Sequence, residues 1–501
     1  LSDTNVMSSP SGSIIELGVK RYPEYFRGKL PKRYKTLSPS EYTLFHFDST
    51  DTGSHGGFDP PELLYPAWMT GILRHGTGED ASVLSLSFCP PGGHRHYDNL
   101  AVFYVDSGDT VLGDHGYVGD MPVNSWIKST YSHNLVIVDD DEQRHRGSPP
   151  RHPRFHNMFT SPKVSLIEAS TDAYEQCDEY RRLVVLLKGP GSRTLAVDIF
   201  RVRGGQKHAY RVFSELASSD ASEGTLSFSN LNMPPEKPLP DIGGSLKKED
   251  IFGFRDIRTV EEPPDHWQAI WQEEERQYRL WMLTSSDRVQ AANGPGQRTL
   301  NDAGRRVRYV DVVREKPNDG SVFVAVHEPG NTDGTMTIEN VRRLDVPPDA
   351  GPDAVALAID SEWGHYLLFS EFDEAVEVEG VRFEGYFGLL CETQNETSWM
   401  CSLGATTAQK DEFGYSGKTA CWEGEVESNT ASEIRTRTRK PSDWPELPPG
   451  CRPYVTAFTG EYWTGFPAES VEEDRIGVGR FLLPGVSRFE LKAFRYTEMQ
   501  N

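Results

Sequence analysis

The chain has 501 residues, of which 37% are hydrophobic and 11% aromatic, a composition that supports sizeable buried cores. Its 75 acidic and 52 basic residues give a formal net charge of −23, which argues against general nucleic-acid binding because that requires a basic surface. A local basic cluster can still serve an anionic ligand. No apolar run approaches the roughly 18–20 residues of a membrane span, and no signal-peptide pattern is visible at the N-terminus.

Short apolar segments predict β-strands through nearly the whole chain. They are rich in β-branched and aromatic residues and are bounded by Gly, Pro, Asp or Asn. In chain order the clearest are 81–88, 100–105, 134–139, 182–188, 193–202, 321–328, 354–359, 365–370 and 487–496. Helical periodicity is rare, although residues 260–283 could hold one or two helical turns behind a proline pair. The chain is therefore predicted to be mainly β, with long sheets.

Composition also suggests how the chain divides into domains. Residues 1–75 are the least regular, and we expect them to wrap the outside or to join a missing part of the protein. The stretch LDVPPDAGPD at 344–353 is the best candidate for a domain boundary, because its prolines interrupt regular structure. We therefore expect a large β domain over 76–345 and a smaller C-terminal β domain over 346–501.

The stretch PPGGHRHYDNLAVFYVDSGDTVLGDHG at 90–116 carries the first chemical signal. His94 and His96 stand two residues apart, so in an extended segment their side chains point to the same side. If DSGD at 106–109 is a turn, strands over 99–106 and 109–115 pair as a hairpin. That hairpin brings Asp114 back toward the histidines, provided that the chain bends near Tyr97–Asn99.

His133 offers a third ligand, because it directly precedes the strongly β segment NLVIVD. Two imidazoles and one carboxylate, from His96, His133 and Asp114, form the donor set of a tetrahedral zinc site with one open position. The competing interpretation is that these histidines only make hydrogen bonds within the sheet. The spacing leaves both interpretations open.

A cupin-like metal enzyme is a further alternative, because cupins also begin a strand with His-x-His. A cupin would place a glutamate about four residues on, where this chain has Leu100 and Ala101. The Pro-x-Gly-x-x-His that would end at His133 is also missing, since IKSTYS precedes it. Half of the cupin pattern is therefore absent.

The ordered set of motifs over about 140 residues resembles the heparinase II/III-type polysaccharide lyases, whose relatives include alginate-type lyases and the dermatan-sulfate epimerase. The matching residues, in chain order, are Arg74, His94, His96, Asp98, Asp114, Gly116, His133, Asn134, Val197, Asp198, His208 and Tyr210. The resemblance implies a large antiparallel β-supersandwich followed by a smaller C-terminal β domain. It also implies cleavage of a uronic-acid-containing acidic polysaccharide by β-elimination.

The resemblance implies separate roles for the two neighbouring histidines. His94 matches the catalytic histidine, which binds or neutralises the uronate carboxylate. His96, Asp114 and His133 match the ligands of a divalent metal, usually zinc. From the substrate class we expect the protein to be secreted or periplasmic.

The chain departs from the family in one respect. Those lyases carry an N-terminal α/α toroid that supplies the catalytic tyrosine, and residues 1–75 show no such helical domain. We expect the toroid to come from a longer chain or a partner chain, or the base to be found locally. Tyr97, Tyr117 and Tyr131 lie near the motif, and each also reads as a packed strand or loop aromatic, so the base stays unassigned.

A basic stretch, RHRGSPPRHPRFH at 144–156, follows the motif. Arg144, Arg146 and Arg151, together with Arg74, are candidates for binding an anionic polymer through charge-assisted hydrogen bonds. The alternative is a solvated loop that balances acidic neighbours such as VDDDE. The favoured function is thus a metal-containing polysaccharide lyase, and the main alternative is a non-catalytic carbohydrate-binding β module.

Overall fold

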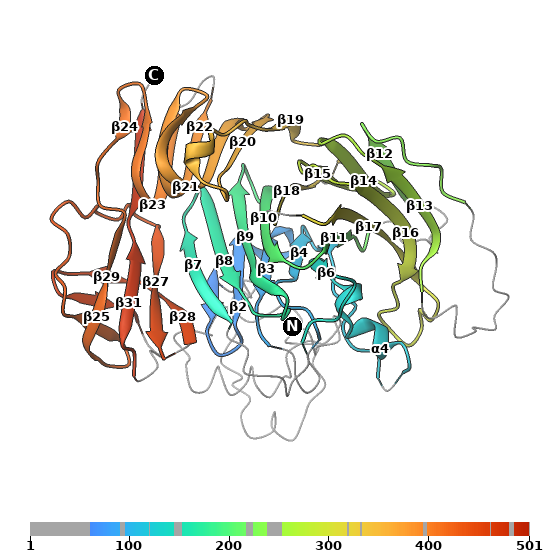
Figure 1. The fold of residues 1–501 in the computed structure, drawn as a ribbon, viewed down its shortest axis with the longest axis horizontal. Coiled ribbons are helices and arrows are strands. Elements are labelled where there is room, and N and C mark those ends of the chain that lie inside the picture. The colour runs from blue at the N-terminus through green and yellow to red at the C-terminus, as the bar shows by residue number, and fades with distance from the viewer. Residues whose placement is uncertain are drawn as a thin grey trace, which may run out of the picture.

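The computed structural model (Figure 1) describes residues 61–90, 96–119, 121–144, 153–216, 224–237, 253–317, 320–330, 333–393, 398–460, 462–479 and 485–499. The fold is nearly all β, as predicted, and its strands form four sheets. Helical structure in the described segments is confined to the short helix α4 (Asn124–Ile127) and the single turns η2 (Gly78–Asp80), η3 (Thr130–Ser132) and η4 (Pro348–Ala350). No helix among these residues is long and apolar enough to cross a membrane.

Two of the sheets have five strands each. The first runs β1 (Leu63–Tyr65), β2 (Thr70–His75), β3 (Ser82–Ser87), β4 (Val102–Asp106) and β5 (Asp109–Leu112). The second runs β13 (Arg255–Glu261), β16 (Arg288–Pro295), β17 (Arg306–Glu315), β11 (Lys207–Phe213) and β6 (Val136–Val138).

The third sheet, here called the central sheet, has fifteen strands. Its order is β12 (Thr225–Ser229), β14 (Trp267–Glu273), β15 (Arg276–Met282), β18 (Ser321–Pro329), β10 (Thr194–Gly204), β9 (Cys177–Lys188), β8 (Val164–Ser170), β7 (Arg154–Thr160), β28 (Tyr462–Pro467), β27 (Arg452–Thr459), β31 (Arg488–Lys492), β25 (Cys421–Asn429), β26 (Glu433–Thr436), β30 (Arg475–Gly477) and β29 (Ser470–Val471).

The fourth sheet has seven strands. They are β19 (Ile338–Arg343), β20 (Val355–Ser361), β21 (Gly364–Val378), β22 (Val381–Glu392), β23 (Ser398–Lys410), β24 (Phe413–Tyr415) and β32 (Phe494–Met499), which pairs with β23. The stretch 344–353 connects β19 and β20, which are antiparallel neighbours in this sheet. Strands from both sides of the stretch also meet in the central sheet, and the predicted domain boundaries stay a prediction.

The central sheet is covered on both faces, which explains the unbroken apolar runs in its sequence. In β9, Val184 and Leu186 pack into the core shared with the two five-stranded sheets. Leu183, Val185 and Leu187 point the other way, into the core shared with the seven-stranded sheet. A strand buried on both faces needs apolar residues at consecutive positions, so its sequence shows no alternation.

Two sequence expectations were wrong. Residues 260–283 hold the hairpin β14–β15 instead of helical turns: Trp267, Ala269 and Trp271 are buried at every second position, which is the period of a strand. Residues 487–496 form two strands instead of one. The chain leaves the central sheet after Lys492, and Phe494 begins β32 in the seven-stranded sheet.

The predicted hairpin at the motif is confirmed. Asp106 pairs with Asp109, and the two central residues of the turn, Ser107 and Gly108, have φ values of 49° and 85°. Positive φ at both central positions is the geometry of a type I′ turn, whose twist matches that of the flanking strands. The hairpin therefore returns the chain toward the segment that precedes β4.

Candidate functional site

Four side chains converge beside the β4–β5 hairpin: His96, Asp98, Asp114 and His133, here called the His–Asp cluster. One ligand atom from each lies within 4.8 Å of the others. Nδ1 of His96 is 3.1 Å from Nε2 of His133 and 3.5 Å from Oδ1 of Asp114, and Nε2 of His133 is 3.7 Å from Oδ2 of Asp114. The structure thus brings together the three residues predicted as metal ligands and adds Asp98.

A turn between His96 and β4 allows this convergence, as the sequence suggested. The Tyr97 amide donates to the Lys128 carbonyl at 2.9 Å, which anchors the segment to the residues before His133. The Ala101 amide donates to the Asp98 carbonyl at 2.9 Å, and Leu100 has a φ of 64°. The bend lies next to the predicted Tyr97–Asn99, and it turns both His96 and Asp98 toward Asp114.

The backbone around the cluster is held by two buried polar side chains. Arg182 in β9 donates from Nη1 to the carbonyl of Leu100 at 2.6 Å and to that of Asn134 at 2.7 Å. Asn134, next to His133, donates to the Gly113 carbonyl at 3.2 Å and accepts from the Phe213 amide at 2.7 Å. These bonds connect all three segments that supply the cluster.

The motif residues Asp198 and Tyr210 belong to this support and not to the cluster. Asp198 accepts hydrogen bonds from Nε and Nη2 of Arg182, at 2.8 and 2.5 Å, and the Tyr210 hydroxyl donates to it at 2.6 Å. Arg182 opposes the effect of burial and lowers the pKa of Asp198 below its ordinary value. The carboxylate therefore stays ionised as the partner of a buried guanidinium.

His133 is arranged to offer a lone pair to the cluster. Its Nδ1 lies 2.8 Å from the Ser129 carbonyl, which can only accept, so Nδ1 carries the proton and Nε2 faces the cluster unprotonated. Burial lowers the pKa of this imidazole to about 3, so it is neutral near pH 7. A neutral imidazole held by a carbonyl behind it is the usual form of a metal-ligating histidine.

The two carboxylates make the cluster suited to a cation. Burial, and then the neighbouring Asp114, raise the pKa of Asp98 to about 6, against the effect of His96. Burial would raise the pKa of Asp114 too, but His96 and His133 lower it below its ordinary value. Two carboxylates, one buried and one half-buried, and two buried imidazoles at this spacing fit zinc or a similar divalent ion.

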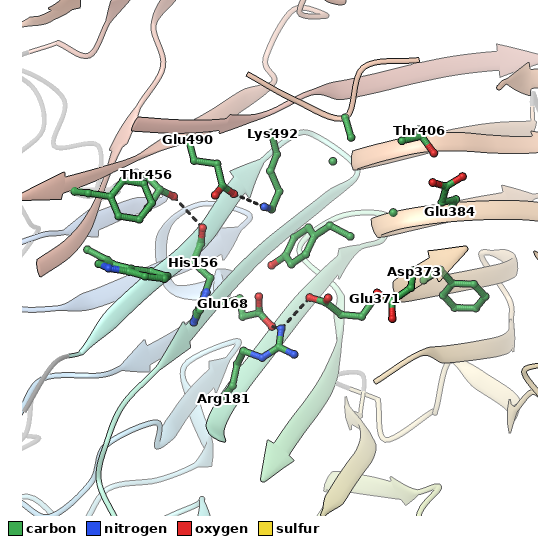
Figure 2. A pocket seen from close by; sticks show the side chains of 17 residues that line it. His156, Glu168, Arg181, Glu371, Asp373, Glu384, Thr406, Thr456, Glu490 and Lys492 are labelled. Carbon is green, nitrogen blue, oxygen red and sulfur yellow. Dashed lines mark hydrogen bonds and ion pairs between the residues drawn. The ribbon is translucent and has the colours of Figure 1, made fainter. Parts of the chain in front are cut away.

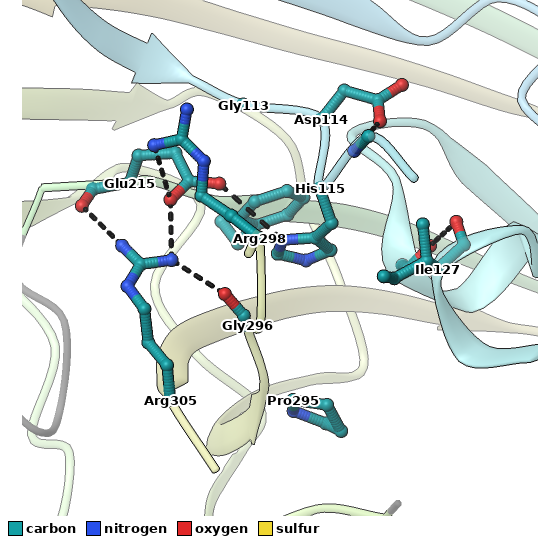
Figure 3. Close-up of polar contacts among 12 residues, drawn as sticks. Gly113, Asp114, His115, Ile127, Glu215, Pro295, Gly296, Arg298 and Arg305 are labelled. Carbon is teal, nitrogen blue, oxygen red and sulfur yellow. Dashed lines mark hydrogen bonds and ion pairs between the residues drawn. The ribbon is translucent and has the colours of Figure 1, made fainter. Parts of the chain in front are cut away.

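A second polar group stands next to the cluster (Figure 3). His115 follows Asp114 in the chain but points to another side, where its Nε2 donates to the Tyr309 hydroxyl at 2.9 Å. Its Nδ1 lies 3.5 Å from Oε1 of Glu215, whose Oε2 is 2.8 Å from Arg305 and 3.4 Å from Arg298. Burial would raise the pKa of Glu215, but Arg305, His115 and Arg298 lower it to about 2.

This second group fixes the backbone that carries Asp114. A side chain at Gly113 would meet Cγ of Glu215 at 2.4 Å, so only glycine fits beside it. Sequence reasoning missed Glu215, Arg298 and Arg305 because they come from segments distant in the chain. No local sequence pattern marks these three residues.

Among the remaining candidates, Arg74 and Arg144 are described, and neither is part of the cluster. Arg74 in β2 donates from Nε to the Gly76 carbonyl at 3.3 Å. Arg144 lies 3.9 Å from Asp172 and 3.7 Å from Glu175, so acidic neighbours already balance its charge. His94, Arg146 and Arg151 lie outside the described residues. Their roles stay predictions.

The three tyrosines near the motif also have local contacts. The Tyr131 hydroxyl donates to the Asp140 carbonyl at 2.5 Å, and the Lys128 ammonium lies 5.2 Å from the centre of the Tyr117 ring. Tyr97 is anchored through its backbone to Lys128. The described contacts give none of these tyrosines a position against the cluster that marks it as the base.

Comparisons with known proteins agree with the motif pattern. The family model described as "Heparinase II/III-like, C-terminal" matches residues 65–323, which is about half of the chain and includes the whole cluster. This match favours the lyase resemblance over the cupin one. No curated protein sequence matches the chain.

The solved structures that the chain matches include a heparan sulfate lyase, HepC, from Pedobacter heparinus, with 13% identity and a TM-score of 0.45 over 75% of this chain and 52% of that chain. Another is a heparinase III, the BT4657 gene product, with 11% identity and a TM-score of 0.46 over 74% of this chain and 49% of that one. The chain thus spans about half the length of these structures.

Proposed function

The chain belongs to the heparinase II/III-like family, and we propose that it is the β-sheet part of a polysaccharide lyase that cleaves a uronic-acid-containing polymer by β-elimination. The observation that carries the proposal is the convergence of His96, Asp98, Asp114 and His133 into one group, of which only Asp114 is partly exposed. These residues come from three separate segments, and a buried arginine and an asparagine hold those segments together.

The proposed ligands of a zinc ion are Nδ1 of His96, Nε2 of His133 and the Asp114 carboxylate, with Asp98 as a fourth donor or as an acceptor beside them. When bound, the ion would supply positive charge and tie the segment that contains His94 to the sheet. His94 itself precedes His96 by two residues, so its proposed place is at the edge of this group, facing the substrate.

The reaction explains why such a site is needed. A base removes the proton at C5 of the uronate, the C5 electron pair forms the C4–C5 double bond, and the 4-linked oxygen leaves and gains a proton. Negative charge builds up on the carboxylate before the oxygen leaves, so groups that bind and neutralise it lower the barrier. His94 is the proposed group for this, and a tyrosine outside the described residues is the proposed base.

The proposed source of that tyrosine is a helical α/α region in the same or a partner chain, because the matching family model is described as a C-terminal region. We propose an acidic polysaccharide as the substrate and a secreted or periplasmic location. The basic residues Arg74, Arg144, Arg146 and Arg151 are the proposed contacts to the polymer.

The proposal is tested on the complete natural protein, with a panel of acidic polysaccharides and the absorbance of the unsaturated uronate product as the readout. We expect product formation, and zinc that is retained after dialysis. His94→Ala should keep the zinc and lose activity, and His96→Ala should lose both. His365→Ala is the matched control, because His365 pairs with Asp360 in the seven-stranded sheet and should keep both.

Two outcomes would contradict the proposal. A protein that keeps its zinc but forms no product from any of the polymers would be a non-catalytic carbohydrate-binding module instead of a lyase. A His96→Ala variant that retains zinc would show that the ligand assignment is wrong.

A further inference from the structure

A cavity of about 490 Å³, here called the acidic pocket, lies where the central sheet meets the seven-stranded sheet (Figure 2). That volume is within the roughly 300–1,000 Å³ of typical small-molecule sites. Most of its walls come from three groups of strands. Strands β7–β9 supply His156, Glu168 and Arg181, and β21–β23 supply residues that include Glu371 and Tyr386. The third group consists of β27, β28 and β31, which supply Thr456, Phe458, Trp463, Glu490 and Lys492.

The acidic pocket lies on the opposite face of the central sheet from the His–Asp cluster. Arg181 and Arg182 are neighbours in β9, and neighbouring residues of a strand point to opposite faces. Arg182 reaches the carbonyls beside the cluster, whereas Arg181 lines the acidic pocket. The pocket is therefore a separate site from the one proposed for elimination.

The pocket carries an excess of negative charge. Its lining includes five carboxylates and two cationic side chains: Glu168, Glu371, Asp373, Glu384 and Glu490 against Arg181 and Lys492. Both cations already have acidic partners, since Arg181 lies 2.9 Å from Glu168 and 2.8 Å from Glu371, and Lys492 pairs with Glu490. Burial, and then Arg181 and Lys492, lower the pKa of His156 to about 3, so this imidazole adds no charge.

The uncharged part of the lining is suited to a hydroxylated ring. Trp463 and Phe458 form an edge-to-face pair with ring centres 5.0 Å apart and give an aromatic wall. Tyr386 and Thr406 add polar side chains to the lining, and the Tyr386 hydroxyl has the Glu168 carboxylate beside it. The carboxylate oxygens of the lining can accept hydrogen bonds from the hydroxyls of a sugar.

We propose that the acidic pocket binds a sugar unit that carries a protonated amine. The carboxylates would attract the ammonium group and accept hydrogen bonds from the sugar hydroxyls, and the aromatic wall would pack against the ring or the cation. The same charge would repel a uronate or a sulfate. The pocket thus selects the opposite charge from the substrate proposed for the His–Asp cluster, and its test does not depend on lyase activity.

The test is calorimetric titration of the whole chain with glucosamine, glucose, glucuronate and putrescine. We expect glucosamine to bind best and glucuronate not at all. Glucose has a closely similar ring without the charge, and putrescine has the charge without the ring. Glucose binding as tight as that of glucosamine would overturn the role of the amine, and putrescine binding as tight would overturn the role of the sugar.

Variants locate the binding. Trp463→Ala should weaken glucosamine binding about tenfold, the value expected for loss of an aromatic contact to a cation. The double variant Asp373→Asn and Glu384→Gln should weaken it about fivefold and leaves the ion pairs of Arg181 intact. His365→Ala is the control, because His365 does not line the pocket, and it should bind normally. Unchanged binding by both pocket variants would overturn the proposal.

Discussion

Arg181 and Arg182 follow one another in β9, yet their side chains make different contacts on the two faces of the central sheet. Arg182 is fully buried, pairs with the single carboxylate Asp198, and donates its remaining hydrogen bonds to backbone carbonyls beside the His–Asp cluster. Arg181 is 11% exposed and has four carboxylates around it: Glu168, Glu179, Asp353 and Glu371. One face therefore holds a balanced, structural pair, and the other keeps an excess of acid facing a cavity.

The largest expected effect comes from removing the balanced pair. Arg182→Leu leaves Asp198 charged and buried and deprives two carbonyls of their donor, so we expect a loss of about 3–5 kcal/mol in the free energy of unfolding. Urea unfolding measures it. Arg181→Leu is the matched comparison and should cost less, because the side chains of Glu179, Asp353 and Glu371 are 16–25% exposed. The buried Glu168 still has Arg201 at 3.9 Å.

If Arg182→Leu does not fold, Arg182→Lys keeps the charge but cannot make the forked contacts, so it should fold with weaker zinc retention. Equal losses for Arg181→Leu and Arg182→Leu would contradict the difference between the faces.

The next largest effect on stability is expected from removal of the proposed metal. At a free zinc concentration about 100 times the dissociation constant, binding stabilises the folded state by roughly 2.7 kcal/mol. A chelator should therefore lower the thermal midpoint of the natural chain and leave that of His133→Ala unchanged. Trp463→Ala, on the other face, should respond like the natural chain, and a chelator response in His133→Ala would argue against the cluster as the zinc site.

Acid should lower the stability of the fold by protonating Glu215, which lies beside the His–Asp cluster. Its pKa is about 2 in the folded protein against an ordinary value of 4.5, so its ionised form stabilises the fold fully above about pH 4.5. This contribution is lost as the pH falls from 4.5 to 2, and it is on the order of 3 kcal/mol. Urea unfolding at several pH values measures it.

Glu215→Gln is the variant that isolates the contribution of the ionised Glu215 to the free energy of unfolding. Over the same pH range its stability should fall less steeply than that of the natural chain, since the glutamine does not titrate. Parallel pH curves for the two proteins would show that Arg298 and Arg305 do not hold the carboxylate as described.

The smallest effect on stability is expected in the acidic pocket. Glu384→Gln removes a partly exposed carboxylate from an acidic lining, so the free energy of unfolding should change by less than about 0.5 kcal/mol. Its zinc content should also stay normal. A loss of unfolding free energy comparable to that of Arg182→Leu would mean that the pocket carboxylates stabilise the fold and are not available to bind a ligand.

Much of the candidate site was predictable because the signals were local. Residue types and spacing identified His96, Asp114 and His133 as a set, and the turn at Asp106–Asp109 formed where its sequence indicated. Asp98 stands two residues after His96, so the same alternation argument could have added it to the set. These features depend on neighbouring residues, which a sequence displays directly.

The other features depend on contacts between distant segments. Arg182 stands at the start of an apolar run and gave no sign that it reaches two carbonyls in other loops. The sequence of 260–283 left room for one or two helical turns, but burial of Trp267 and Trp271 against the core selected a hairpin. In each case packing partners chose among conformations that the local sequence left open.

By itself the sequence determined the β class, the short strands and the ligand types, because these follow from side-chain chemistry and from periodicity along the chain. Only the tertiary structure decided that the central sheet is covered on both faces, and hence that adjacent arginines serve different sites. It also decided that five carboxylates from four strands would meet in one cavity. Charge and burial at a point in space depend on every segment that packs there, so no single segment can specify them.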